Sequence, residues 1–332
     1  MKRKRLITKS ILAGMVLALV GISSCKEKKE KVKAAEDVVA EVEASDPFFE
    51  LSLAQWSMHR MIRNDGTDPY SFAEKAKAWG FTGLEYVSQL YDKELEAADY
   101  SAEAMANFIS KCNEEAEKHG VKNVLIMIDG EGDLAADDKA ERDVAIENHK
   151  KWVDAAAAMG CHAVRVNLSG SDDPEKWMNN SIDGLGRLAA YGAEKNIEVI
   201  VENHGGLSSN ASMLTGVMRS INKTNCGTLP DFGNFCIRRN NASDGGGCAE
   251  EYDKYQGVTE LMPHAKAVSA KSHVFDAEGN ESNIDYVRML QIVKDAGYTG
   301  YIGVEYEGSE LSEEEGIIAT RDLLINAAKK LN

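Results

Sequence analysis

The stretch Ile197-Glu198-Val199-Ile200-Val201-Glu202-Asn203-His204-Gly205-Gly206 joins a short apolar run to three polar residues and two glycines. Such a run is typical of a central strand in a parallel sheet, where both faces are covered. Glu, Asn and His at its C-terminal end stand where α/β barrels carry their reactive groups. The alternative is a strand that ends in an ordinary polar loop. Because the same pattern recurs downstream at a regular interval, we favour the functional interpretation.

Strand-like and helix-like segments alternate along the chain from Phe48 onward. The predicted strands are 49–56, 82–87, 122–129, 162–168, 197–201, 227–235 (a short strand plus loop), 265–276 and 301–308. The predicted helices are 67–80, 101–119, 137–159, 181–195, 210–222, a weak one before Met262, 284–297 and 311–331. Strict alternation predicts parallel strands joined by crossover helices.

Eight such units in the 285 residues of 48–332 predict one catalytic domain with the (β/α)8 TIM barrel fold, which typically takes about 250 residues. A doubly wound sheet is the alternative. That fold usually carries a glycine-rich turn after its first strand, and the segment QWSMHRM (55–61) contains no glycine.

Residues 1–24 are interpreted as a signal peptide. Basic residues 2–5 precede a short apolar run, and Ile22-Ser23-Ser24-Cys25 follows it. The segment resembles the bacterial lipoprotein signal, which implies lipidation of Cys25 and a place in the cell envelope, periplasmic or at the outer membrane. An uncleaved anchor is the alternative. Residues 25–47 are rich in charge and poor in aromatics, so we interpret them as a linker between the lipidated cysteine and the barrel.

The net charge and the spacing of the cysteines argue against several classes of function. The chain has a formal net charge of −16, although its first 24 residues contribute five positive charges and no negative ones. This excess of acid argues against nucleic acid as a partner and leaves the lipid anchor as the membrane contact. No CxxC motif is present, which argues against a zinc ribbon or a redox motif. A disulfide among Cys226, Cys236 and Cys248 is compatible with export.

Four metal-ligand side chains follow the last four predicted inner strands. They are separated by 29, 42 and 32 residues, against about 31 for one strand-helix unit. Neighbouring strand ends converge at a barrel mouth, so these groups are expected to meet: Glu202, Asp231, His273 and Glu305. Three carboxylates and one imidazole suit one divalent ion. Carboxylate-rich ligation favours Mn²⁺, with Mg²⁺, Co²⁺ or Zn²⁺ as alternatives.

The segments FTGLEYV, VIVENHGG, LPDFGNF, HVFD and YIGVEYEG resemble the sugar phosphate isomerase/epimerase family, which shares the xylose isomerase-like TIM barrel. The resemblance covers nearly all of 48–332. It implies that Glu202, Asp231, His273 and Glu305 bind the ion, and that Glu202 and Glu305 also form the catalytic acid/base pair. The family often has His-x-His before an acidic residue, and the earlier position here is Lys271. A shift of strand register would turn Lys271 or Ser272 toward the pocket in place of His273.

Proton removal beside a ketose carbonyl needs a carboxylate base and stabilisation of the enediolate that forms. A divalent ion stabilises the enediolate by acting as a Lewis acid. Other polar residues near the predicted strand ends are candidates for binding substrate: His59, Glu85, Asn167, His204, Asn234 and Lys271. Asp129 and Trp56 lie at equivalent places. For each of them a structural role is the alternative.

The predicted export disfavours a phosphorylated substrate, because sugar phosphates are intracellular. The basic pair Arg238-Arg239 is interpreted as solvated loop and not as a phosphate site. The leading prediction is therefore a metal-dependent isomerase or epimerase of an unphosphorylated sugar. Beta-elimination by a 3-keto-glycoside lyase or an inosose-type dehydratase is the nearest alternative. A non-catalytic sugar-binding lipoprotein is a second alternative. The DNA-repair endonucleases that share the barrel need more histidines and a basic face than this chain has.

Overall fold

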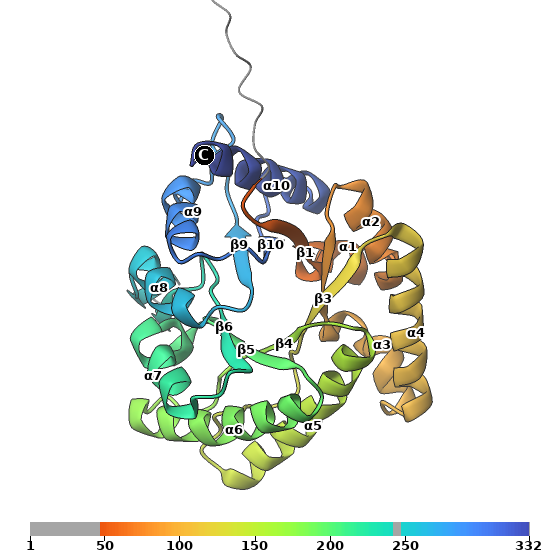
Figure 1. The fold of residues 1–332 in the computed structure, drawn as a ribbon, viewed down its shortest axis with the longest axis vertical. Coiled ribbons are helices and arrows are strands. Elements are labelled where there is room, and N and C mark those ends of the chain that lie inside the picture. Colours follow the sequence, from red (N-terminus) through yellow and green to blue (C-terminus); the bar gives the residue numbers. More distant parts are fainter. Residues whose placement is uncertain (1–46, 242–246, 332) are drawn as a thin grey trace, which may run out of the picture. The chain divides into compact units, whose positions relative to one another are not determined.

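A computed structural model describes residues 47–241 and 247–331. The predicted signal peptide, Cys25 and all but the last residue of the predicted linker lie outside the described residues. In the described part, eight parallel strands form one sheet in the order β6-β5-β4-β3-β2-β1-β10-β9. Isolated parallel bridges between Thr228 and Ala265 and between Asp231 and Ser269 join its two ends. The sheet therefore closes into the predicted (β/α)8 barrel, ringed by helices (Figure 1).

The sheet strands agree closely with the predicted segments. They are β1 Glu50–Ala54, β2 Gly83–Val87, β3 Lys122–Met127, β4 Ala163–Val166, β5 Glu198–Glu202, β6 Cys226–Leu229, β9 Val268–Ser272 and β10 Tyr301–Tyr306. Val199, Ile200 and Val201 of β5 are fully buried, because helices cover the outer face and side chains fill the interior. Each such side chain contributes about 1.5–3 kcal/mol on burial.

The helices of the described residues confirm the predicted alternation. They are α1 His59–Arg63, α2 Phe72–Ala78, α3 Asp92–Leu95, α4 Ala102–His119, α5 Lys139–Ala158, α6 Pro174–Glu194, α7 Ala211–Ile221, α8 Lys254–Leu261, α9 Tyr286–Asp295 and α10 Glu313–Lys329. None of them combines the length and the apolar character that a membrane span needs.

Helix α6 begins earlier than the predicted start at residue 181. Asp173 caps it by accepting hydrogen bonds from the backbone of Glu175 and Lys176, and Pro174 occupies the first helical turn. Both residues are strong helix-start signals. The prediction was wrong here because it followed the apolar periodicity and passed over the cap.

A two-stranded antiparallel hairpin lies between β6 and α8 and was not predicted. Its strands are β7 Cys236–Arg239 and β8 Cys248–Glu251. A disulfide joins Cys236 to Cys248, whereas Cys226 is buried and free. The disulfide that the sequence left open among these three cysteines is therefore present, between Cys236 and Cys248. The interpretation of Arg238 and Arg239 as solvated loop is corrected, because both belong to β7.

Candidate functional site

The candidate site lies at the C-terminal end of the barrel, where strand ends surround a cavity of about 620 Å³. Its lining is largely polar and comes from strands far apart in the sequence. The lining residues include Trp56, Asp129, Arg165, His204, Asn234, Lys271, His273, Glu305 and Glu307, together with Cys236, Arg239, Cys248 and Glu251 of the hairpin. The hairpin therefore forms one rim of the cavity.

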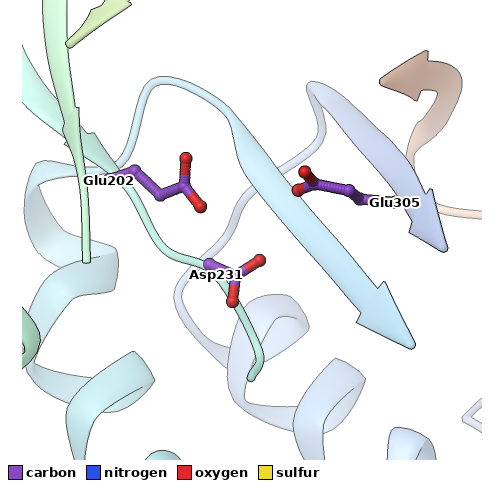
Figure 2. A group of neighbouring side chains, drawn as sticks. All are labelled: Glu202, Asp231 and Glu305. Carbon is purple, nitrogen blue, oxygen red and sulfur yellow. The ribbon is translucent and has the colours of Figure 1, made fainter. Parts of the chain in front are cut away.

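Three carboxylates gather beside this cavity, and one of them, Glu305, lines it. Glu202 ends β5, Asp231 follows β6 and Glu305 lies near the end of β10. One oxygen atom from each lies within 4.8 Å of the other two, and the three side chains point toward a common centre (Figure 2). All three residues are at most 3 % exposed. The sequence spacing thus predicted a real convergence of these three residues.

Hydrogen bonds orient each of these carboxylates. Asp231 accepts from the backbone N–H groups of Gly233 and Asn234 at 2.8 and 2.7 Å. Its other oxygen accepts from the Ser269 hydroxyl at 2.7 Å, and the same hydroxyl lies 3.0 Å from Oε2 of Glu305. The single hydroxyl hydrogen of Ser269 is therefore shared between two of the three carboxylates.

Only one of the two carboxylate oxygens of Glu202 accepts a hydrogen bond from the part of the chain that the structure describes. Its Oε1 accepts from the side-chain amide of Asn234 at 2.9 Å. Its Oε2 lies 3.0 Å from Nε of Arg165, but the N–H is not directed at this oxygen, and Oε2 has no hydrogen-bond partner among the described residues. A buried carboxylate oxygen without a partner is costly. Such an atom is suited to a ligand or a metal ion.

Burial and the repulsion between neighbouring carboxylates raise the pKa of two of these three carboxyl groups. Burial, reinforced by the charge of Glu305, raises the pKa of Glu202 to about 7 in spite of Arg165. Burial also raises the pKa of Asp231 to about 7, with Glu202 and Glu305 adding to the effect and Lys271 opposing it. These carboxyls therefore bind protons near neutral pH, which is a property shared by many functional carboxylates.

His273 does not belong to the group of three. It follows β9 and lines the cavity. Besides Ser269, the residue of β9 that contacts the carboxylates is Lys271, which pairs with Glu305 in the strand register. Its Nζ lies 3.9 Å from Asp231, 3.7 Å from Glu305 and 3.1 Å from Glu307. A basic residue thus stands beside the three carboxylates at the position that was predicted as a candidate for substrate binding.

The other substrate-binding candidates are dispersed. His204 and Asn234 line the cavity. Asn167 donates to Asp129 at 2.7 Å, and it lines a smaller adjoining cavity. His59 lies outside the lining, where its ring stacks on Trp56 and its Nδ1 approaches Glu313 at 3.3 Å.

Glu85 also lies outside the lining, fully buried on β2. The Ser52 hydroxyl donates to Oε1 of Glu85 at 2.6 Å. Burial raises the pKa of Glu85 to about 8, so the side chain is protonated at neutral pH. Gly303 has no room for a Cβ, because that atom would collide with this carboxyl group. The position therefore needs glycine for Glu85 to fit inside the barrel.

Sequence reasoning missed Arg165, Ser269 and Glu307. Each lies two positions away from a candidate that was named: Arg165 from Asn167, Ser269 from Lys271, and Glu307 from Glu305. Alternate residues of a strand point to the same face. Extending each candidate by two residues along its strand would have found all three.

Comparisons with known proteins support the fold. The family described as xylose isomerase-like TIM barrel matches residues 73–327. A comparison with curated protein sequences finds no match.

Solved structures share the barrel at low sequence identity. An IolI protein with a bound zinc atom is 14 % identical with a TM-score of 0.62, over 85 % of this chain and 99 % of that one. L-ribulose 3-epimerase is 14 % identical with a TM-score of 0.64, over 85 % and 97 %. The 3-keto-D-glucoside 4-epimerase of E. coli is 13 % identical with a TM-score of 0.59, over 83 % and 98 %. At these identities the likeness establishes the fold. Because the family match extends over well more than half of the chain, the protein belongs to the xylose isomerase-like TIM barrel family.

Proposed function

We propose that the protein is an isomerase or epimerase of an unphosphorylated sugar, which removes a proton next to a ketose carbonyl. The observation that carries this proposal is the convergence of Glu202, Asp231 and Glu305 beside a polar cavity that Glu305 lines. Burial raises the pKa of Glu202 and of Asp231 to about 7, and carboxyl groups in this range are effective acid/base groups at neutral pH. The cavity is also large enough for a monosaccharide.

The three carboxylates fit a divalent ion. Their oxygen atoms are hard ligands, they lie within 4.8 Å of one another, and Oε2 of Glu202 has no hydrogen-bond partner among the described residues. We propose that Glu202, Asp231 and Glu305 hold the ion. His273 lines the cavity but lies outside this group of three. All-carboxylate ligation suits Mn²⁺ or Mg²⁺ better than Co²⁺ or Zn²⁺, and we propose Mn²⁺. When bound, the ion would supply Lewis-acid stabilisation of the negative charge that develops on the sugar.

The protein side chains would perform the proton transfers. Glu202 and Glu305 are assigned as the acid/base pair, since they approach the centre from opposite sides (Figure 2). Asn234 orients Glu202 and Ser269 orients Glu305 through their hydrogen bonds. Fixed orientation of a base removes much of the entropic cost of reaching the transition state. His204 and Trp56, which line the cavity, are positioned to contact the sugar.

The charges of the cavity lining support an unphosphorylated substrate. Arg165 and Lys271 face carboxylates of the protein itself, at 2.7 Å from Asp129 and 3.1 Å from Glu307. Among the lining residues, Arg239 on the hairpin is the remaining guanidinium. A phosphate group is usually bound by several converging donors. The lining is better suited to sugar hydroxyls.

The similar solved structures include proteins described as sugar epimerases, and one that acts on a 3-keto-D-glucoside. We extend this substrate class to the present chain as part of the proposal.

We also propose that Cys25 is lipidated and tethers the enzyme in the cell envelope. Labelling of the expressed protein with a radioactive fatty acid, and loss of the label in Cys25→Ala, would test the anchor.

Solvent exchange tests the reaction. The Mn²⁺-loaded protein is incubated in D₂O with a panel of ketoses and 3-keto-glycosides, and products are analysed by NMR and mass spectrometry. Deuterium incorporated into an isomer that retains all other atoms supports isomerisation. Release of water or an aglycone assigns the same first step to a lyase or dehydratase. Sugar binding without exchange in any substrate would refute the proposed function and would favour a sugar-binding lipoprotein.

A further inference from the structure

A buried lysine stands among the proposed metal ligands. Lys271 is 2 % exposed, although lysine is rarely buried unless it is paired with acidic groups. Its Nζ lies within 4 Å of the carboxylates of Asp231, Glu305 and Glu307. Lys271 lines the cavity, whereas Asp231 does not. The ammonium group therefore stands at the boundary between the cavity and one of the proposed ligands.

The position of Lys271 is set by the barrel. Strand β9 lies next to β10 in the sheet and is bridged to the segment after β6 by the Asp231–Ser269 pair. The three carboxylates come from β5, from the segment after β6 and from β10, so β9 is the neighbouring strand that completes this side of the barrel. Its contribution at the level of Glu305 is Lys271. A protonated amine has no lone pair and cannot ligate a metal ion.

The side chain of Lys271 is closely packed. A Cβ added at Gly233 would approach its stem at 3.3 to 3.5 Å, and the Tyr286 hydroxyl donates to its backbone carbonyl at 2.7 Å. A hydrogen bond to Glu307 holds the amino group itself. The positive charge is therefore fixed in position and close to two of the oxygens that would bind the ion.

We propose that Lys271 is a built-in cation of this centre. It takes the place of a fourth metal ligand, neutralises Asp231 and Glu305 from within, and opposes a divalent ion that binds the same carboxylates. A fixed positive charge about 4 Å from the ligand atoms disfavours a second cation strongly in a buried site. The ion is accordingly bound by three carboxylates, weakly and exchangeably. This inference rests on the metal centre of the proposed function, but it does not depend on the identity of the sugar.

Metal titration of single variants tests the inference. The full chain is stripped of metal, and Mn²⁺ is titrated by calorimetry into wild type, Lys271→His and Lys271→Met. We expect Lys271→His to bind Mn²⁺ at least ten-fold more tightly, because it replaces a charge with a ligand. Lys271→Met removes the charge alone and should bind with intermediate affinity. The matched control is Lys266→His, which adds a histidine beside Glu198 at the opposite end of the barrel and should leave the affinity unchanged.

The inference is overturned if neither Lys271 variant binds Mn²⁺ more tightly than wild type. Circular dichroism in EDTA and in Mn²⁺ monitors folding. A variant that folds only in Mn²⁺ supports the inference, since the ion then replaces the missing charge. Failure of both variants to fold even in Mn²⁺ overturns it. The titration contains no sugar, so its result does not depend on the reaction. If the wild-type protein exchanges no substrate proton in D₂O, the proposed function is refuted, and the titration still decides the role of Lys271.

Discussion

The two sides of the cavity differ in how far the charges of their carboxylates are balanced by nearby cations. On the side of β3 and β4, Asp129 forms an ion pair with Arg165 at 2.7 Å and accepts from Asn167 at 2.7 Å. On the side of β5, β6 and β10, two cations lie near the three carboxylates: Lys271, which is close to Glu305, and Arg165, whose Nε lies near Glu202. The first side is neutral as a unit, whereas the second carries more negative charge than its own cations balance.

The pKa values show the consequence of this difference. Burial acts to raise the pKa of Asp129, but the charge of Arg165 and its hydrogen bonds outweigh burial, and the pKa lies below its usual value. Burial raises the pKa of Glu202 to about 7, and Arg165 and Lys271 do not compensate. A paired carboxylate stabilises the barrel, and an uncompensated one is available for protons, a metal ion or substrate.

The largest expected effect concerns turnover. Glu202→Gln and Glu305→Gln should each lower kcat by about 10²- to 10⁴-fold, which is the usual contribution of a general acid or base. The fold should persist, because glutamine has the same shape and the uncompensated side loses a repulsive charge. Steady-state kinetics and circular dichroism measure both. Exposed Glu310→Gln serves as the control, and a variant of Glu202 or Glu305 with unimpaired turnover would contradict the assignment.

The next effect concerns stability and should appear on the other side of the cavity. Asp129→Asn leaves the buried Arg165 guanidinium without its main partner, which typically costs about 3–5 kcal/mol. Urea denaturation of the metal-free protein should show this loss, while Glu202→Gln should show little or none. Exposed Asp172→Asn is the matched control. Equal losses for Asp129→Asn and Glu202→Gln would remove the proposed distinction between the two sides.

A smaller effect is expected for the metal ion. Asp231→Asn replaces a charged ligand with a neutral one, and it should weaken Mn²⁺ binding by at least about ten-fold, equivalent to about 1.4 kcal/mol. Elemental analysis after dialysis and calorimetric titration measure this change. Asp129→Asn is not expected to alter the affinity to the same extent, because Asp129 lies outside the group of three. Unchanged Mn²⁺ binding by Asp231→Asn would place the ion elsewhere.

The smallest effect is a pH dependence of stability. Because the folded-state pKa values of Glu202 and Asp231 are raised to about 7, their contribution to stability is present below pH 4 and is lost as the pH rises from about 4 through 7. Between pH 5.5 and 8, the Tm of the metal-free protein should fall by about 2–4 °C more in wild type than in Glu202→Gln. Asp129 acts in the opposite direction, since its stabilisation is lost as the pH falls through its lowered pKa. A Tm difference that is independent of pH would contradict the raised values.

The sequence predicted the barrel well, because its signals are local. Apolar runs of four to six residues identified the inner strands, and Gly80, Gly120 and Gly160 lie at the ends of three of the predicted helices. The cap at Asp173 was present in the sequence but was not used. The hairpin β7–β8 carries no comparable signal, since its exposed and half-exposed strands show no apolar alternation.

The sequence by itself determined the order of strands and helices and the spacing that brings Glu202, Asp231 and Glu305 to one end of the barrel. Only the tertiary structure decided that β9 presents Lys271 to these carboxylates and places His273 farther along the lining. It also decided that Arg165 lies between Asp129 and Glu202. The physical reason is that periodicity is read within one segment, whereas the residue that faces a neighbour at the barrel mouth depends on the register between strands, and that register is set by packing across the whole sheet.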